Sequence, residues 1–147
     1  MSPYRIVLAD DHIMLRQGIK KIIETSEAME VVGEAGDGFE LLGLLKKITT
    51  DMVILDIAMP KLRGVEATRE IKTAYPEVEI LILSMHRKKE YLYHVFAAGA
   101  RGYLLKEDTD TELFTAIETV RQGGVYLSPL LSRELAGDFI EICRGGG

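Results

Sequence analysis

Five side chains with acid, hydroxyl or amine groups stand directly after short apolar runs of the sequence. Asp10 and Asp11 follow the first run, Asp56 follows the third, Ser84 the fourth and Lys106 the fifth. If these runs are strands of one parallel sheet, all five side chains meet at one edge. Carboxylates packed together resist ionising unless a cation joins them. Lys106 offsets part of that charge, and a hard divalent ion with oxygen ligands offsets more.

The chemistry of this set favours Mg²⁺ and phosphoryl transfer. Mg²⁺ usually keeps several waters and takes one or two carboxylates together with phosphate oxygens. The histidines His12, His86 and His94 lack the spacing of a zinc site. A carboxylate beside Mg²⁺ and a lysine is placed to attack phosphorus and form an acyl phosphate, with Ser84 as a hydrogen-bond donor. The set is therefore sufficient for phosphoryl transfer to Asp56.

Each of these residues has a simpler interpretation when it is taken alone. Asp10 and Asp11 suit the N-terminus of a helix, and Asp56 suits a turn that continues to Pro60 and Gly64. A single serine or lysine at a strand end is uninformative. Only the joint placement of all of them favours the phosphoryl-transfer interpretation.

The apolar pattern predicts the elements that position these groups. Short β-rich runs occupy residues 4–9, 30–35, 52–55, 79–83 and 102–105. Between them the spacing is helical, as in Met14, Ile19, Ile22 and Ile23. Strict alternation of strands and helices predicts right-handed crossovers and a parallel sheet with helices on both faces.

We therefore expect an α/β fold, a doubly wound, flavodoxin-like three-layer sandwich with a five-stranded parallel sheet in the order 2-1-3-4-5. In such sheets the site lies outside the carboxyl ends of the strands, near the point where the strand order reverses. The second run, which ends before Asp37, lies at the edge of the sheet in this order. Asp37 is expected outside the cluster.

The composition limits the class of protein. The chain of 147 residues suits one domain, and its net charge of -5 argues against this segment gripping a nucleic-acid backbone. The lone cysteine, Cys143, cannot form an internal disulfide, which fits a reducing cytosol. We find neither a signal peptide nor an apolar stretch of about 18 residues, so a cytoplasmic location without a membrane partner is expected.

Several segments together resemble the receiver domain of two-component response regulators over residues 4–122. They are residues 7–12 (VLADDH), 55–60 (LDIAMP) with Gly64, 83–84 (LS) and 102–106 (GYLLK). The resemblance implies a phosphorylation switch rather than an enzyme, with Asp56 as the acceptor and a sensor histidine kinase as the donor. It further implies that Asp11 and Asp56 bind Mg²⁺ directly, that Asp10 helps through water and that the Ala58 backbone carbonyl completes the set.

The same resemblance assigns the remaining roles. Lys106 binds the phosphate, Ser84 is the switch hydroxyl and Tyr103 is the aromatic that moves with it. Ala58 and His86 stand where the family tunes the phosphate lifetime. Since Ala58 has no polar side chain to orient water, slow self-dephosphorylation is expected. Many receivers have proline after the lysine, where this chain has Glu107, so the isomer of that peptide bond stays open.

Residues 10–12 (DDH), 102–106 and 124–129 (GVYLSP) resemble the NarL/LuxR class of transcriptional regulators. In that class a linker leads to a helix-turn-helix DNA-binding domain. We therefore expect a receiver at residues 1–127 and the start of a linker helix at 128–147, with Ser128 and Pro129 at its beginning. DNA contact is expected only through a C-terminal domain absent from this chain. Dimerisation on phosphorylation is expected around Tyr103 and the last two receiver helices.

Three other functions have to be weighed. A haloacid-dehalogenase type of enzyme needs a second acid two residues after its nucleophile, where this chain has Ala58. A flavin or dinucleotide binder needs a glycine-rich loop after the first strand, where Asp10 and Asp11 stand instead. A stand-alone receiver that signals by protein contact alone remains an alternative, and the NarL/LuxR-like segment 124–129 argues against it.

Overall fold

The computed structural model describes residues 2–145, and side chains as far as residue 137. Six strands form one sheet: β1 (Tyr4–Ala9), β2 (Met29–Ala35), β3 (Met52–Asp56), β4 (Glu79–Ser84), β5 (Gly102–Leu105) and β6 (Tyr126–Leu127). The helices are α1 (Ile13–Ile23), α2 (Gly38–Lys47), α3 (Gly64–Ala74), α4 (Lys89–Ala98), α5 (Thr109–Arg121) and α6 (Pro129–Gly145), with a 3-10 turn, η1 (Lys106–Asp108), before α5.

The strands run parallel in the order β2-β1-β3-β4-β5-β6. This confirms the doubly wound α/β fold and the order of the first five strands. The predicted count of five was wrong, because β6 adds a sixth strand beside β5. Two residues are too short for an apolar pattern to show a strand, and β6 exists only through its pairing with Gly102 and Tyr103.

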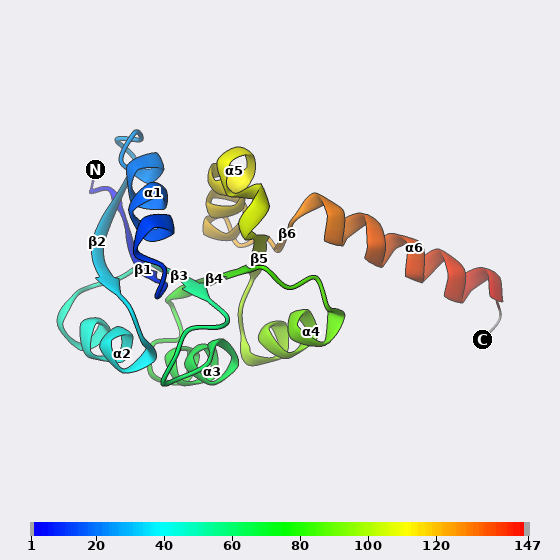
Figure 1. Cartoon of the computed structure of the whole chain (residues 1–147), viewed down its shortest axis with the longest axis horizontal. Coiled ribbons are helices and arrows are strands. Elements are labelled where there is room, and N and C mark those ends of the chain that lie inside the picture. The colour runs from blue at the N-terminus through cyan, green and yellow to red at the C-terminus, as the bar shows by residue number, and fades with distance from the viewer. Residues whose placement is uncertain (1, 146–147) are drawn as a thin grey trace.

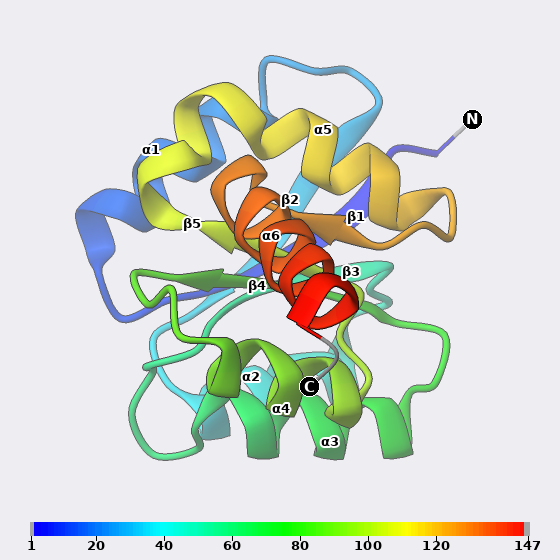
Figure 2. The ribbon, with the colours of Figure 1, turned by 90° about the vertical axis from the view of Figure 1, so that its right-hand side faces the viewer.

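Two apolar layers enclose the sheet (Figures 1 and 2). On one face α1 and α5 cover strand residues such as Ile6, Leu8 and Ile54. On the other face α2, α3 and α4 cover Val7 and Leu55 among others. Central strands buried on both faces explain the continuous apolar runs in the sequence. The three-layer prediction is therefore confirmed.

Helix α1 departs from the predicted apolar face at its first turn. Ile19 and Ile23 are buried as expected, but Met14 is 90% exposed. This turn follows the carboxyl end of β1 at the rim of the sheet, and its neighbouring residue Ile13 is also exposed. The prediction of Met14 on the buried face was wrong.

Helix α6 leaves the body of the domain and projects away from it (Figure 1). It begins at Pro129, as the sequence predicts. Among the described residues, no helix has the length and apolarity needed to cross a membrane. Cys143, on which the expectation of a reducing location rests, lies outside the described side chains.

Candidate functional site

The register of the sheet brings the predicted residues to one edge. Ala9 pairs with Leu55 and Asp56 with Leu83. Further along, Ser84 pairs with Leu105. Because the strands are parallel, the residues that end β1, β3, β4 and β5 come out side by side, as the rule for doubly wound sheets requires.

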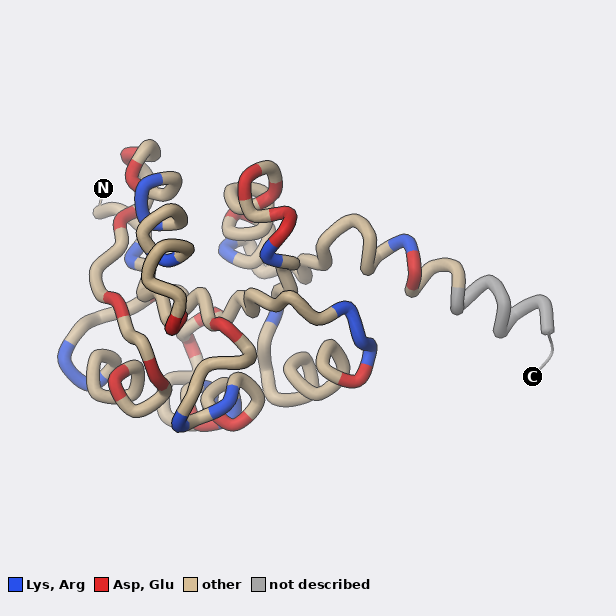
Figure 3. Tube along the Cα trace, in the orientation of Figure 1, with Lys and Arg blue, Asp and Glu red and all other residues tan. Residues whose placement is uncertain are grey.

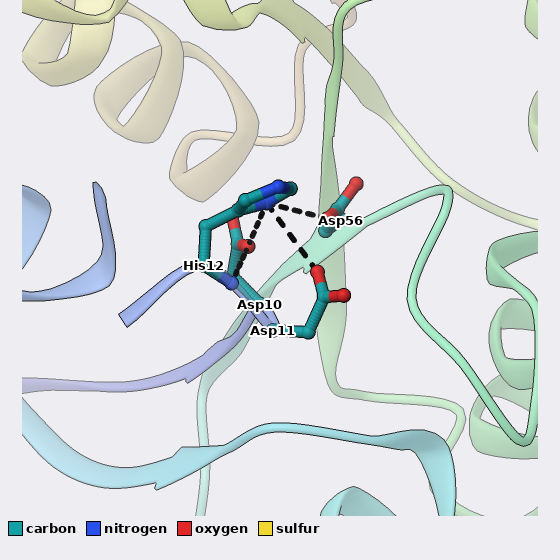
Figure 4. Close-up of side chains that lie close together, drawn as sticks. All are labelled: Asp10, Asp11, His12 and Asp56. Atoms are coloured by element: carbon teal, nitrogen blue, oxygen red, sulfur yellow. Dashed lines mark hydrogen bonds and ion pairs between the residues drawn. The ribbon is translucent and has the colours of Figure 1, made fainter. Parts of the chain in front are cut away.

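Three carboxylates form the centre of this edge. Asp10 and Asp56 are 2% and 1% exposed, whereas the Asp11 side chain is 41% exposed. One ligand atom from each of them and one from His12 lie within 4.8 Å of one another (Figure 4). Two nearly buried acids and a more exposed third therefore form one cluster, in which Asp11 is the carboxylate most open to solvent.

Lys106 supplies positive charge to the two buried acids. Its Nζ lies 3.2 Å from Asp56 Oδ2 and 3.5 Å from Asp10 Oδ2. The lysine side chain is 11% exposed, so solvent screens these contacts less than it screens a surface pair. Lys106 can therefore hold anionic oxygens beside Asp56.

The backbone of the following loop fixes the orientation of Asp56. The Ala58 N–H donates to Asp56 Oδ1 at 3.0 Å. This bond leaves Oδ2 facing Lys106, 3.2 Å from its Nζ. The two carboxylate oxygens therefore differ, since Oδ1 faces the loop backbone and Oδ2 faces the Lys106 ammonium.

His12 lies among the acids, which the sequence did not predict. Its Nδ1 is 3.1 Å from Asp10 Oδ1, 3.3 Å from Asp11 Oδ1 and 3.9 Å from Asp56 Oδ2 (Figure 4). The spacing that predicts a zinc site does not detect His12. The available signal was its position directly after two acids at a strand end. Because its side chain is 60% exposed, it has room to move away from the pocket.

The donor set fits a hard divalent cation. It offers carboxylate oxygens from three aspartates, the ligands that Mg²⁺ prefers in proteins. Asp10 Oδ2 is buried and accepts no hydrogen bond within the described chain, so it has capacity left for a cation or for water bound to one. Ala58 lies beside Asp56 through its N–H, and its predicted role as a carbonyl ligand stays a prediction.

Ser84 and Tyr103 meet at the loop after β4. The His86 N–H donates to Ser84 Oγ at 2.8 Å, and the Tyr103 hydroxyl donates to the His86 carbonyl at 2.9 Å. Tyr103 is fully buried, and this burial raises its pKa. Ser84, Met85, Lys106 and Glu107 line a hollow of about 460 Å³. Ser84 and Lys106 therefore border one space next to Asp56.

Glu107, which stands where many receivers have proline, forms an ion pair with Arg87. It accepts from Arg87, whose Nε lies 3.1 Å from Glu107 Oε1, and this contact raises the Arg87 pKa. The Lys106–Glu107 peptide bond, which the sequence left open, is trans. The contact joins the loop after β4 to the turn after β5 on the surface.

Asp37 lies outside the cluster, as expected for the edge strand β2. Its carboxylate accepts from the Glu40 N–H at 2.9 Å and caps α2. That bond and the nearby Lys61 ammonium hold the Asp37 pKa below its usual value. Its role is structural.

Charges of both signs are interspersed over the helices of the domain (Figure 3). The net charge of the whole chain is -5.

Comparisons with known proteins agree with the geometry. The response regulator receiver domain family matches residues 6–118. The chain is 41% identical over 135 residues to the transcriptional regulatory protein DegU of Brevibacillus brevis, covering 92% of this chain and 57% of that protein. It is 41% identical over 137 residues to the oxygen regulatory protein NreC of Staphylococcus epidermidis, covering 92% of this chain and 63% of that protein. The chain thus spans less than two thirds of these relatives.

Solved structures give the same result. A two-component response regulator of the LuxR family from Aurantimonas sp. SI85-9A1 superposes with a TM-score of 0.89 at 37% identity, covering 95% of this chain and 100% of that one. The receiver domain of NarL from Mycobacterium tuberculosis superposes with a TM-score of 0.79 at 32% identity, covering 84% and 99%. The chain belongs to the receiver domains of two-component response regulators, in the NarL/LuxR class.

Proposed function

We propose that Asp56 accepts a phosphoryl group from a sensor histidine kinase in a reaction that requires Mg²⁺. Receiver domains of this family are signalling switches. The observation that carries the assignment is the placement of Asp56 Oδ2, held toward Lys106 while Oδ1 is fixed by the Ala58 N–H. Asp10 and Asp11 complete the acidic pocket around it.

In the proposed step Asp56 Oδ2 attacks the phosphorus of the kinase phosphohistidine. A P–O bond forms, the P–N bond breaks, and the leaving imidazole keeps the electron pair and takes up a proton. Lys106 neutralises charge on the phosphoryl oxygens. Asp11 and Asp56 would hold Mg²⁺ directly, with Asp10 acting through water and the Ala58 carbonyl as a further ligand. The ion supplies further charge neutralisation.

We assign the switch to Ser84 and Tyr103. Ser84 Oγ accepts a bond from its own loop, and rotation of that hydroxyl toward a phosphate on Asp56 would release the His86 amide. Tyr103 is bonded to the carbonyl of the same residue, His86. A change at Ser84 therefore reaches Tyr103 through the backbone of one residue.

We infer a long-lived acyl phosphate. Ala58 has no polar side chain that could orient a water molecule toward the phosphorus, and His86 is the other residue that we assign to tuning the phosphate lifetime. Self-dephosphorylation is proposed to be slow, and a half-life of seconds in the purified protein would contradict this.

We infer the output from the relatives, two of which are named as a transcriptional regulatory protein and an oxygen regulatory protein. Residues 1–127 would form the receiver, and residues 128–147 would begin a linker toward a helix-turn-helix DNA-binding domain. Phosphorylation would favour a homodimer around Tyr103, α4 and α5, in the cytoplasm. A stand-alone receiver is the alternative.

Mass spectrometry after incubation with acetyl phosphate and Mg²⁺ tests the acceptor. The unmodified chain should gain the mass of one phosphoryl group, and Asp56→Asn should not. Asp37→Asn is the matched control, because it makes the same change after the edge strand β2, away from the acid cluster, and asparagine still caps α2. An undiminished adduct in Asp56→Asn would falsify the assignment. Chelation of Mg²⁺ should abolish the adduct, and Asp11→Asn should raise the Mg²⁺ concentration required.

A further inference from the structure

Ser128 is a buried polar residue between β6 and α6 that the proposed function does not use. It has no exposed surface. Its N–H donates to the Tyr103 carbonyl at 3.0 Å, and its Oγ accepts from the Leu105 N–H at 2.8 Å. Both partners lie on β5, and Leu105 stands 23 residues away in sequence. The side chain therefore joins the end of the sheet to the start of α6.

The Oγ of Ser128 takes the place of a missing strand carbonyl. Strand β6 pairs with β5 only at Gly102–Tyr126 and Tyr103–Leu127, and the chain then turns into α6 at Pro129. A third paired residue would have offered its carbonyl to the next free N–H of β5. Leu105 is 1% exposed, so water does not replace that carbonyl, and an unpaired buried N–H is unfavourable.

Ser128 also starts α6. Its carbonyl accepts from the Ser132 N–H at 3.1 Å, the first bond of the helix. One turn into α6, Leu131 is 2% exposed and packs in the same apolar cluster as Tyr103 and Leu105. The start of α6 is thus joined to β5 by two hydrogen bonds and the buried Leu131, and the partly buried Leu130 and Leu135 pack against the same cluster. The helix then projects from the domain (Figure 1).

The residue after Leu105 is Lys106, whose Nζ lies 3.2 Å from Asp56 Oδ2. We propose that Ser128 is a positioning residue that couples Lys106 to α6, so that phosphorylation of Asp56 and the orientation of α6 depend on each other. The inference rests on the proposed function of Asp56. The Lys106 ammonium already contacts Asp56 and Asp10. A phosphoryl group would add further anionic partners and stiffen the end of β5, and Ser128 would transmit this to the first turn of α6. Coupling between two sites is reciprocal, so a loosened α6 slows phosphorylation.

Spin labels measure the coupling in the whole chain. Labels at Ala136→Cys on α6 and Thr115→Cys on α5, in a Cys143→Ser background, report the distance between the helix and the body. With beryllofluoride and Mg²⁺ the distance distribution should narrow. In Ser128→Ala it should stay broad, and the rate of phosphorylation by acetyl phosphate at saturating Mg²⁺ should fall about fivefold or more.

Two variants separate coupling from general destabilisation. Ser132→Ala makes the same substitution at an exposed position of the first turn of α6 and should behave as the unmodified chain. Ser128→Thr keeps the hydroxyl acceptor and should restore most of the rate and the narrowing. A folded Ser128→Ala with an unchanged rate and the same narrowing overturns the inference.

If Ser128→Ala does not fold, amide hydrogen exchange in the unmodified chain tests the coupling instead. Protection of the Leu105 amide should rise about fivefold or more with beryllofluoride and Mg²⁺, and unchanged protection overturns the inference. If the unmodified chain forms no adduct that depends on Asp56, the proposed function fails instead. The two failures are thus distinguishable.

Discussion

The strands β4 and β6 flank β5 on its two sides, and a fully buried serine stands at the end of β4 and directly after β6. Ser84 closes β4, and its Oγ accepts from the His86 N–H two residues further along the chain. Ser128 follows β6, and its Oγ accepts from the Leu105 N–H across the sheet. Residue type and burial are the same at the two ends, but the partners differ.

That difference separates a movable group from a fixed one. The bond of Ser84 is local, so in the switch proposed above its hydroxyl would leave the His86 amide and donate to a phosphate oxygen while β4 stays paired. The bond of Ser128 joins two elements, so breaking it frees the end of β5 and the start of α6 together. Lys106 directly follows the strand between them. It borders the same hollow as Ser84, and it comes after Leu105, whose N–H Ser128 binds.

The largest effect is expected from Lys106, because its ammonium contacts Asp56 and the residue directly before it, Leu105, is bonded to Ser128. Lys106→Met removes the ammonium beside Asp56 and keeps a side chain of similar length. The rate of phosphorylation by acetyl phosphate should fall at least about a hundredfold, since a positioned charge on the reacting group is lost. Lys88→Met, in the exposed segment before α4, is the control and should leave the rate unchanged. A phosphorylation rate within a factor of about three of that of the unmodified chain would show that Lys106 does not act in the reaction.

The β6 end should contribute more to stability than the β4 end. Leu131→Ala removes a leucine that is 2% exposed and should lower the free energy of unfolding by roughly 2–5 kcal/mol in urea titrations. Met85, next to Ser84, is 75% exposed, so Met85→Ala should change stability by less than about 0.5 kcal/mol. Equal effects of the two changes would contradict the idea that the first turn of α6 belongs to the core.

The two serines should also contribute differently to the free energy of unfolding, with Ser128 contributing more than Ser84. Ser128→Ala leaves the Leu105 N–H buried without an acceptor and should lower the free energy of unfolding by about 1–3 kcal/mol. Ser84→Ala frees the amide of His86, an exposed residue in a loop that water can reach, so the loss should be smaller, about 0.5–1 kcal/mol. The reverse order would show that Ser84, and not Ser128, joins two elements.

The smallest effect concerns Tyr126 of β6, whose hydroxyl donates to Glu112 Oε1 of α5 at 2.6 Å. Burial, and then the Glu112 carboxylate, raise the Tyr126 pKa above its usual value. This contribution to stability is therefore complete below the unfolded tyrosine pKa, near 10, and is lost as the pH rises above it. In Glu112→Gln an ultraviolet titration should show a lower Tyr126 pKa that still exceeds the usual value, because burial remains. No change in that pKa would exclude the Glu112 contact.

The patterns of the sequence predicted most of the sheet and its polar edge. Continuous apolar runs mark strands buried on both faces, and the residue after each run lies at the carboxyl edge because parallel strands share a direction. That reasoning placed Asp10, Asp56 and Lys106 at one edge, where the structure has them in contact. Asp37 was placed outside it for the same reason, since β2 lies at the end of the strand order.

Features that depend on contact between distant segments left no such pattern. The two-residue strand β6 is too short for periodicity, and Met14 fits the apolar spacing of α1 although its side chain is exposed. His12 points into the acid cluster because of the path of the loop after β1, which its residue type does not reveal.

The sequence by itself determined the doubly wound fold, the edge at which chemistry is possible and the residue types gathered there, because these follow from local periodicity and chain direction. Only the tertiary structure decided that Ser128 completes the hydrogen bonding of β5 and starts α6. A side chain that bonds a backbone amide 23 residues away has no repeating signature, since its partner is set by where two elements pack and not by the residues beside it.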